Sequence, residues 1–161
     1  MIDYAIKYLF DGLGASPLTM GRLIMGIPSE SPFWDVRPDE DRLSAREILA
    51  HLATWEGLLI ERLKRIREEE NPPFVHPGES VLARQHGYAT SDPWVQLELW
   101  RSRREHTLGI LRDLRPEEWK RCESRNIGLV SAEELAVLML GHDGYHARQM
   151  VEWLEFFEQS G

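Results

Sequence analysis

The chain has 161 residues, a formal net charge of -8 at pH 7 and a hydrophobic share of 42%. These values suit one soluble domain spanning residues 1–161, and no apolar run is long enough to cross a bilayer, so we expect no membrane partner. The acidic balance argues against nucleic acid as a partner, because phosphate binding requires a surplus of Lys and Arg.

The first predicted element is helical and carries no export signal. The N-terminus lacks a basic start followed by an apolar signal core, so we expect a cytoplasmic protein. Apolar residues recur at helical spacing over residues 2–13. Ser16 can cap a further segment that has Pro17 at its first position and runs to about residue 27. The pattern is compatible with two helices or one kinked helix, so residues 1–15 are a helical extension or the first half of helix 1.

A connection rich in proline and acidic residues covers residues 28–41, and we expect Phe33 and Trp34 to anchor it to the body of the protein. The next helix is predicted over residues 44–70, because residues 44–47 form a Ser-x-x-Glu capping box. Its core row recurs at helical spacing and consists of Ile48, Leu52, Trp55, Leu59, Leu63 and Ile66.

The following stretch, residues 71–92, shows no clear periodicity. A loop of this length in a compact domain is often a lid, a binding rim or a partner contact. We interpret His76 and His86 as loop histidines with only a small chance of approaching a ligand. A third helix is predicted to follow, and Arg104 lies within its apolar row.

Arg104 has two interpretations. A buried guanidinium is usually paired with an acidic residue from another helix, and this is the favoured one. The alternative is an arginine aimed at an anionic substrate group inside the bundle.

Between the third helix and the last one we predict a single helical turn at residues 116–119 and then a polar loop. This loop contains Cys122, the only cysteine, which excludes an internal disulfide and any cysteine-based zinc cluster. A lone nucleophilic thiol is a minor alternative, because it would need a base or a cation beside it. No strand alternation is found, and helical rows with modest connections predict an all-α, antiparallel four-helix bundle.

The last helix is predicted over residues 131–157, and it opens on a second capping box at residues 131–134. His142, His146 and Gln149 interrupt an apolar row that otherwise consists of Leu135, Leu138, Met139, Met150, Trp153, Phe156 and Phe157. A buried imidazole without a partner is costly. Residues i and i+4 share one helix face, so both imidazoles can reach one metal ion. The alternative is a pair of core histidines bonded to neighbouring helices or to water.

His51 supplies a third candidate ligand, because it lies on the flank of its helix, next to Trp55, where it can face a neighbouring helix. Three neutral imidazoles at His51, His142 and His146 would hold a divalent ion and leave coordination positions open, which is typical of catalytic rather than structural sites. Imidazole ligands suit several ions. Zinc or nickel is our first expectation, with iron and manganese as alternatives.

Competing metal motifs fit less well. His142 and His146 have the spacing of a zincin, but Asp143 stands where the general-base Glu would be. The Glu-x-x-His pairs of di-iron bundles are absent. An HD-type phosphohydrolase would need further ligands that the sequence does not offer. No glycine-rich phosphate loop or Gly-x-Ser-x-Gly motif is present.

The pattern Leu43-Ser44-x-x-Glu47-x-Leu49-x-His51-Leu52-x-x-x-Glu56, combined with His142-x-x-x-His146-x-x-Gln149, resembles the DinB-like family over roughly residues 16–157. The resemblance implies a bundle in up-down-down-up order with a long crossover, and a divalent metal on the three histidines. It also implies a homodimer and a small-molecule substrate, because some relatives are transferases or isomerases that use low-molecular-weight thiols. One departure is Leu43, where the family usually has Trp.

These observations define three hypotheses. The first is a metal-dependent transferase or hydrolase in which Gln149 and Asp143 orient a ligand or the substrate, and Arg104 or Tyr145 contacts the substrate. The second is a non-catalytic bundle that binds a metal or a small ligand. The third is an interaction module whose histidines are structural.

Overall fold

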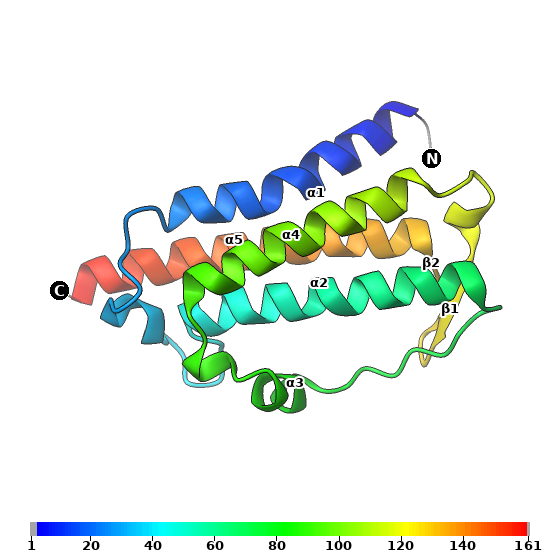
Figure 1. Cartoon of the computed structure of the whole chain (residues 1–161). Coiled ribbons are helices and arrows are strands. Elements are labelled where there is room, and N and C mark those ends of the chain that lie inside the picture. The colour runs from blue at the N-terminus through cyan, green and yellow to red at the C-terminus, as the bar shows by residue number, and fades with distance from the viewer. Residues whose placement is uncertain (1–2, 161) are drawn as a thin grey trace.

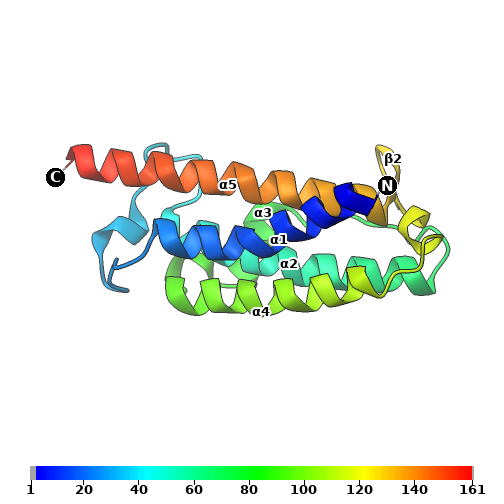
Figure 2. The same cartoon turned by 90° about the horizontal axis from the view of Figure 1, so that it is seen from above.

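The computed structural model describes residues 3–160, and four long helices dominate it (Figure 1). Helices α1 and α2 each pack against both α4 and α5 (Figure 2). The bounds of these helices are Asp3–Leu23 for α1, Ala45–Glu68 for α2, Pro93–Arg112 for α4 and Ala132–Ser160 for α5.

The order of directions is up-down-down-up, as the family resemblance implied. α1 and α5 run one way along the bundle, and α2 and α4 run the other way (Figure 1). The expectation of a purely antiparallel bundle is therefore wrong for the two parallel pairs in contact, α2 with α4 and α1 with α5. The reason is the crossover between α2 and α4, which returns the chain along the outside of α2 to the end where α2 began.

The crossover is not an irregular loop. It contains the short helix α3 (Glu79–Gln85) and the 3-10 turn η2 (Tyr88–Thr90). Leu82 and Tyr88 are buried and form an apolar cluster with Ala50 and Trp55. This cluster attaches the crossover to α2, so a segment without sequence periodicity still has a defined position.

A β-hairpin departs from the predicted all-α class. β1 (Cys122–Arg125) pairs antiparallel with β2 (Gly128–Ser131). The crossover adds one bridge to it, because the Phe74 N–H donates to the Ser124 carbonyl and the Ser124 N–H donates to the Pro72 carbonyl, both at 2.9 Å. Each strand buries only one side chain, so alternation could not reveal it in the sequence.

α1 is one continuous helix despite Pro17. The predicted extension over residues 1–15 is therefore the first half of α1, as far as it is described. Residues 1–2 lie outside the described residues. Proline has no N–H, which leaves the carbonyl four residues earlier, on Leu13, without its helical donor. The Arg104 Nη1 donates to that carbonyl at 2.7 Å. The predicted cap at Ser16 is absent, because this hydroxyl instead donates to the Gly12 carbonyl at 3.0 Å.

Both predicted capping boxes are confirmed. The Glu47 N–H donates to the Ser44 hydroxyl and Glu47 accepts from the Ser44 N–H. The same reciprocal pair joins Ser131 and Glu134 at the start of α5. Phe33 and Trp34, in the 3-10 turn η1 (Pro32–Asp35), are buried as expected. The predicted turn near Trp119 is the 3-10 turn η3 (Glu118–Lys120).

The core has two apolar halves, separated by a polar layer that contains the candidate site. One half includes Leu13, Leu59, Leu111 and Met139, and the other includes Met20, Leu52, Trp100 and Trp153. On α5 the predicted core row is wrong at Leu138 and Phe156, which are 52% and 43% exposed. Within residues 3–160, no helix combines the length and apolar character needed to cross a membrane.

Candidate metal centre

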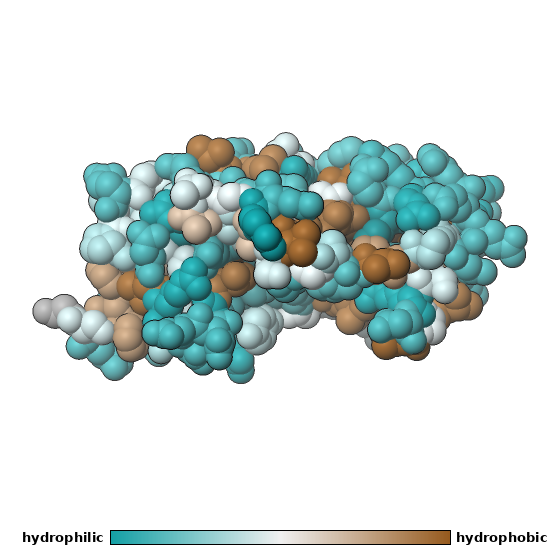
Figure 3. Space-filling view, turned by 90° about the horizontal axis from the view of Figure 1, so that it is seen from below, coloured by the Kyte–Doolittle hydropathy of each residue, from teal (hydrophilic) through white to brown (hydrophobic). Residues whose placement is uncertain are grey.

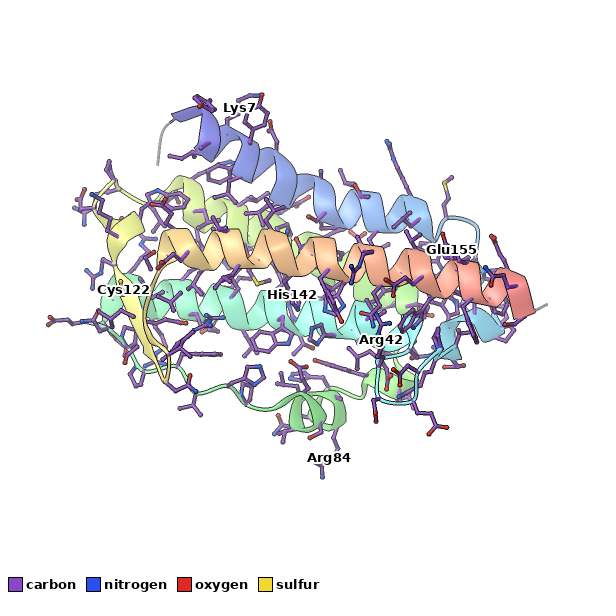
Figure 4. All side chains as sticks on the ribbon, turned by 180° about the vertical axis from the view of Figure 1, so that it is seen from behind. Lys7, Arg42, Arg84, Cys122, His142 and Glu155 are labelled. Atoms are coloured by element: carbon purple, nitrogen blue, oxygen red, sulfur yellow. The ribbon has the colours of Figure 1, made fainter. Side chains whose placement is uncertain are left out.

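Three imidazoles from α2 and α5 meet in the polar layer. The Nε2 of His142 lies 2.9 Å from the Nε2 of His51 and 3.2 Å from the Nε2 of His146. Figure 4 shows His142 in the space between α5 and α2. Two imidazole nitrogens on a tetrahedral zinc ion stand about 3.3 Å apart, given Zn–N bonds of about 2.0–2.1 Å. The three histidines are therefore spaced for one shared cation.

The outer ring nitrogens determine which atoms face that common point. The Nδ1 of His146 lies 2.9 Å from the Gln149 side-chain oxygen. The Nδ1 of His51 lies 3.0 Å from a carboxylate oxygen of Glu79. The Gln149 oxygen accepts a hydrogen bond from the His146 Nδ1, so the Nε2 of His146 presents a lone pair to the centre. The contact between His51 and Glu79 is electrostatic, because its alignment does not make a hydrogen bond. The facing carboxylate favours the proton on the His51 Nδ1 and leaves the Nε2 lone pair toward the centre. Lone pairs that converge in a buried place require a proton or a cation between them.

The protonation state of the α5 histidines agrees with this arrangement. Burial, followed by the charge of His51, lowers the pKa of His142 to about 4. Burial, followed by the charges of His142 and His51, lowers the pKa of His146 to about 3. Both rings are thus neutral near pH 7, and neutral imidazole is the form that binds metals. The Nδ1 of His142 is buried and has no hydrogen-bond partner among the described residues.

The fold is similar to that of known proteins. The family profile of the DinB superfamily matches residues 30–150. The chain belongs to the DinB superfamily. A search of curated proteins finds no match. Among solved structures, the chain is similar to YfiT from Bacillus subtilis, described as a probable metal-dependent hydrolase with an unusual four-helix bundle topology. The TM-score is 0.88 and the identity 18%, over 98% of this chain and 90% of YfiT.

Glu79 contacts His51 in this DinB-superfamily chain, and sequence reasoning missed it. It lies at the start of α3, beside His51, and it also accepts a hydrogen bond from the Trp55 Nε1 at 3.2 Å. Burial alone would raise the pKa of Glu79, but the contacts with His51, His76 and Trp55 outweigh burial and lower it. The carboxylate is therefore ionised beside the imidazole. No sequence signal could have placed it there, because the crossover has no periodicity.

Arg104 and Asp143 lie in the polar layer but do not turn toward the histidines. The five N–H groups of Arg104 are matched by five contacts, two with Glu56, two with Asp143 and one with the Leu13 carbonyl, at 2.6–3.2 Å. The side chains of all three charged residues are at most 2% exposed. Arg104 thus has no donor left for a substrate, which corrects the alternative that it contacts one. Asp143 orients Arg104 rather than a metal ligand.

Tyr145 and Gln149 differ in their relation to the site. Gln149 is buried and contacts His146 directly. Tyr145 is 48% exposed, and its ring packs edge-on against the outer side of His146, with centroids 5.0 Å apart. Its predicted contact with a substrate would therefore have to be made from the outer surface.

A cavity of about 270 Å³ opens beside His142. Its apolar wall comes from α5 and Trp55, and its polar groups come from α2, the crossover and the hairpin. This volume is near the lower end of small-molecule pockets, so it suits a small substrate rather than a macromolecule. The lining side chains are Trp55, Arg62, His76, Glu79, Arg125, Leu135, Leu138, Met139 and His142. Figure 3 shows the face that carries α3, where small hydrophobic patches interrupt a mainly hydrophilic surface.

Proposed function

We propose that this protein is a metal-dependent enzyme that acts on a small molecule. His51, His142 and His146 hold one divalent cation, and the cavity beside His142 receives the substrate. The observation that carries this proposal is the convergence of three Nε2 atoms at 2.9 and 3.2 Å, two of them on rings whose Nδ1 faces an acceptor. Zinc or nickel fits three neutral imidazoles, and iron or manganese is the alternative.

The chain's own residues have defined tasks in this proposal. Gln149 and Glu79 keep the protons of His146 and His51 on Nδ1, which directs both lone pairs inward. Trp55 covers the site from α2, because its ring lies 6.1 Å from His51 and 6.4 Å from His142, centroid to centroid. A bound divalent ion would supply Lewis acidity to a substrate at its open positions.

The reaction class follows from this chemistry and from the fold relative. Hydrolysis is the first candidate, since YfiT is described as a probable metal-dependent hydrolase. Transfer to or from a low-molecular-weight thiol is the alternative, because a cation also stabilises a thiolate. Both reactions need open coordination positions beside a small cavity.

Metal analysis of the purified protein tests the ligand set. We expect about one zinc or nickel ion per chain after loading and dialysis, and almost none in His142→Ala or His51→Ala. His106→Ala is the matched control, because His106 is exposed on α4 and is not among the three grouped ligands. An unchanged metal content in His142→Ala would contradict the proposal. Loaded protein that turns over neither activated esters and amides nor thiol and electrophile pairs would contradict its enzymatic part.

A further inference from the structure

The cavity beside His142 has a cationic end that the metal site does not use. Arg62 from α2 and Arg125 from the hairpin both line the cavity. Both are bonded to the same buried carboxylate, Glu123, at 2.5 and 2.9 Å from Arg62 and at 2.6 Å from Arg125. Two guanidinium groups share one carboxylate, so these three side chains have a net charge of +1. The other carboxylate that lines the cavity, Glu79, contacts His51 and Trp55 instead.

The donors of the cluster are not all used. Arg62 bonds Glu123 through Nε and Nη2, and Arg125 bonds it through Nε alone. The remaining N–H groups of Arg125 have no hydrogen-bond partner in the described part of the chain. The Phe74 ring lies under both guanidinium carbons, at 4.1 and 5.1 Å from its centroid, and holds their planes in place.

Arg62 is a buried cation that is paired with Glu123. Its side chain is 7% exposed, and burial lowers its pKa more than the hydrogen bonds and charge of Glu123 raise it. A second anion beside Arg62 and Arg125 would offset the cost of burying the charge of Arg62.

The opposite wall of the cavity is apolar. Leu135, Leu138 and Met139 present one face of α5 to it, and Leu138 is 52% exposed although it is a large apolar side chain. A ligand that covers this wall would remove apolar surface from water. The cavity thus joins a cationic end and an apolar wall to His142.

We infer that Arg62 and Arg125 form a subsite for the carboxylate of a small monoanionic substrate whose apolar body lies on Leu135, Leu138 and Met139. The net charge of +1 is neutralised by one carboxylate, whereas a phosphate dianion would exceed it. The fork of a guanidinium matches the two oxygens of a carboxylate. Placing the reacting group of this substrate toward His142 rests on the proposed function, but the carboxylate subsite itself does not.

The test measures binding of hexanoate by isothermal titration calorimetry, with hexanamide as the neutral probe of the same shape. We expect hexanoate to bind in the millimolar range or tighter, and hexanamide to bind about tenfold more weakly or not at all. Shortening the probe to butanoate should weaken binding by about fourfold for each buried methylene that is lost. Titration of metal-free protein removes direct carboxylate–metal bonding as an explanation.

Arg125→Gln is the decisive variant, since Arg125 is partly exposed and its loss leaves the Arg62–Glu123 pair intact. We expect hexanoate affinity to fall about tenfold or more, and Arg125→Lys to retain part of it. Arg84→Gln is the control, because this substitution removes one positive charge, as Arg125→Gln does, but on the outer side of α3 (Figure 4). An unchanged unfolding midpoint shows that Arg125→Gln is folded.

The outcomes separate this inference from the proposed function. Hexanoate binding that depends on Arg125 would support the subsite even in a protein that takes up no metal on loading, whereas that failed loading would contradict the metal site. Equal affinities for hexanoate and hexanamide, or an Arg125→Gln variant that binds hexanoate as wild type does, would overturn the subsite whatever the metal content. No detectable hexanoate binding in the wild type would overturn it as well.

Discussion

At the scale of single residues, the polar layer is built by side chains whose partners come from distant parts of the chain. His146 is oriented by Gln149 on its own helix, and His51 is oriented by Glu79 on the crossover. A spacing of three residues on one helix is visible in the sequence, so the pair His146 and Gln149 could be anticipated. The pair His51 and Glu79 could not, because it joins a helix to a segment with no pattern.

Replacement of Glu79 tests this orientation. In Glu79→Ala we expect metal affinity to fall about 10–100-fold, because His51 loses the carboxylate whose charge favours a proton on Nδ1. Competition with a chromophoric chelator measures the affinity. Glu70→Ala is the control for charge, because Glu70 is an exposed acidic residue just beyond α2. This variant should bind metal as wild type does. Equal affinities in the two variants would show that Glu79 is not a positioning residue.

Replacement of Arg104 tests the buried ion pairs. In Arg104→Met we expect the free energy of unfolding to fall by about 3–5 kcal/mol, because Glu56 and Asp143 are left buried without a cation. Urea denaturation followed by circular dichroism measures the loss. The triple variant that also carries Glu56→Gln and Asp143→Asn should recover a large part of it. A loss below about 1 kcal/mol in Arg104→Met would contradict this account.

At the scale of elements, the crossover and α1 show how a local anomaly is stabilised by tertiary contacts. Pro17 interrupts the backbone hydrogen bonds of α1, and Arg104 of α4 supplies the missing donor to Leu13. The crossover has little local preference for structure, and Leu82 and Tyr88 hold it against α2. Because α3 carries Glu79, the stability of this segment is coupled to the geometry of the metal centre.

Truncation of Leu82 tests that coupling. In Leu82→Ala we expect amide hydrogen exchange to accelerate over residues 71–92, while α2 and α4 keep their protection, since the lost contacts belong to a satellite cluster. Metal affinity should decrease in parallel, because Glu79 is held less firmly. Hydrogen exchange with mass spectrometry measures the first effect. Faster exchange with unchanged metal affinity would show that α3 does not orient His51.

At the scale of the whole molecule, two apolar halves enclose a polar layer in which α2 and α5 bring the histidines together. A cation bound only by the folded chain must raise its stability, by about 2.7 kcal/mol at a free concentration of 100 times the dissociation constant. Chelation should therefore lower the unfolding temperature of the wild type and leave that of the His51→Ala/His142→Ala variant unchanged. Differential scanning calorimetry with and without EDTA measures both, and a wild type that is insensitive to chelation would argue for structural histidines.

The sequence alone determined three of the four long helices, both capping boxes and the two histidines on one face of α5, because each depends on residues within a few turns of each other. For α1 it left open whether there are two helices or one kinked helix, and the structure has one continuous helix. The sequence also contained the pattern of the DinB superfamily, although the parallel pairing of α2 with α4 was not visible in its periodicity.

Only the tertiary structure decided the surroundings of Arg104, Glu79 and Arg125. The role of Arg104 was ambiguous, because an arginine in an apolar row gives the same sequence pattern whether it pairs with an acidic residue or faces a substrate. In the folded chain it pairs with Glu56 and Asp143. Glu79 and Arg125 lie in a crossover and a hairpin whose positions depend on long-range packing and not on local preference. Local rules act over a few residues, whereas this site gathers groups from four separate segments of the chain.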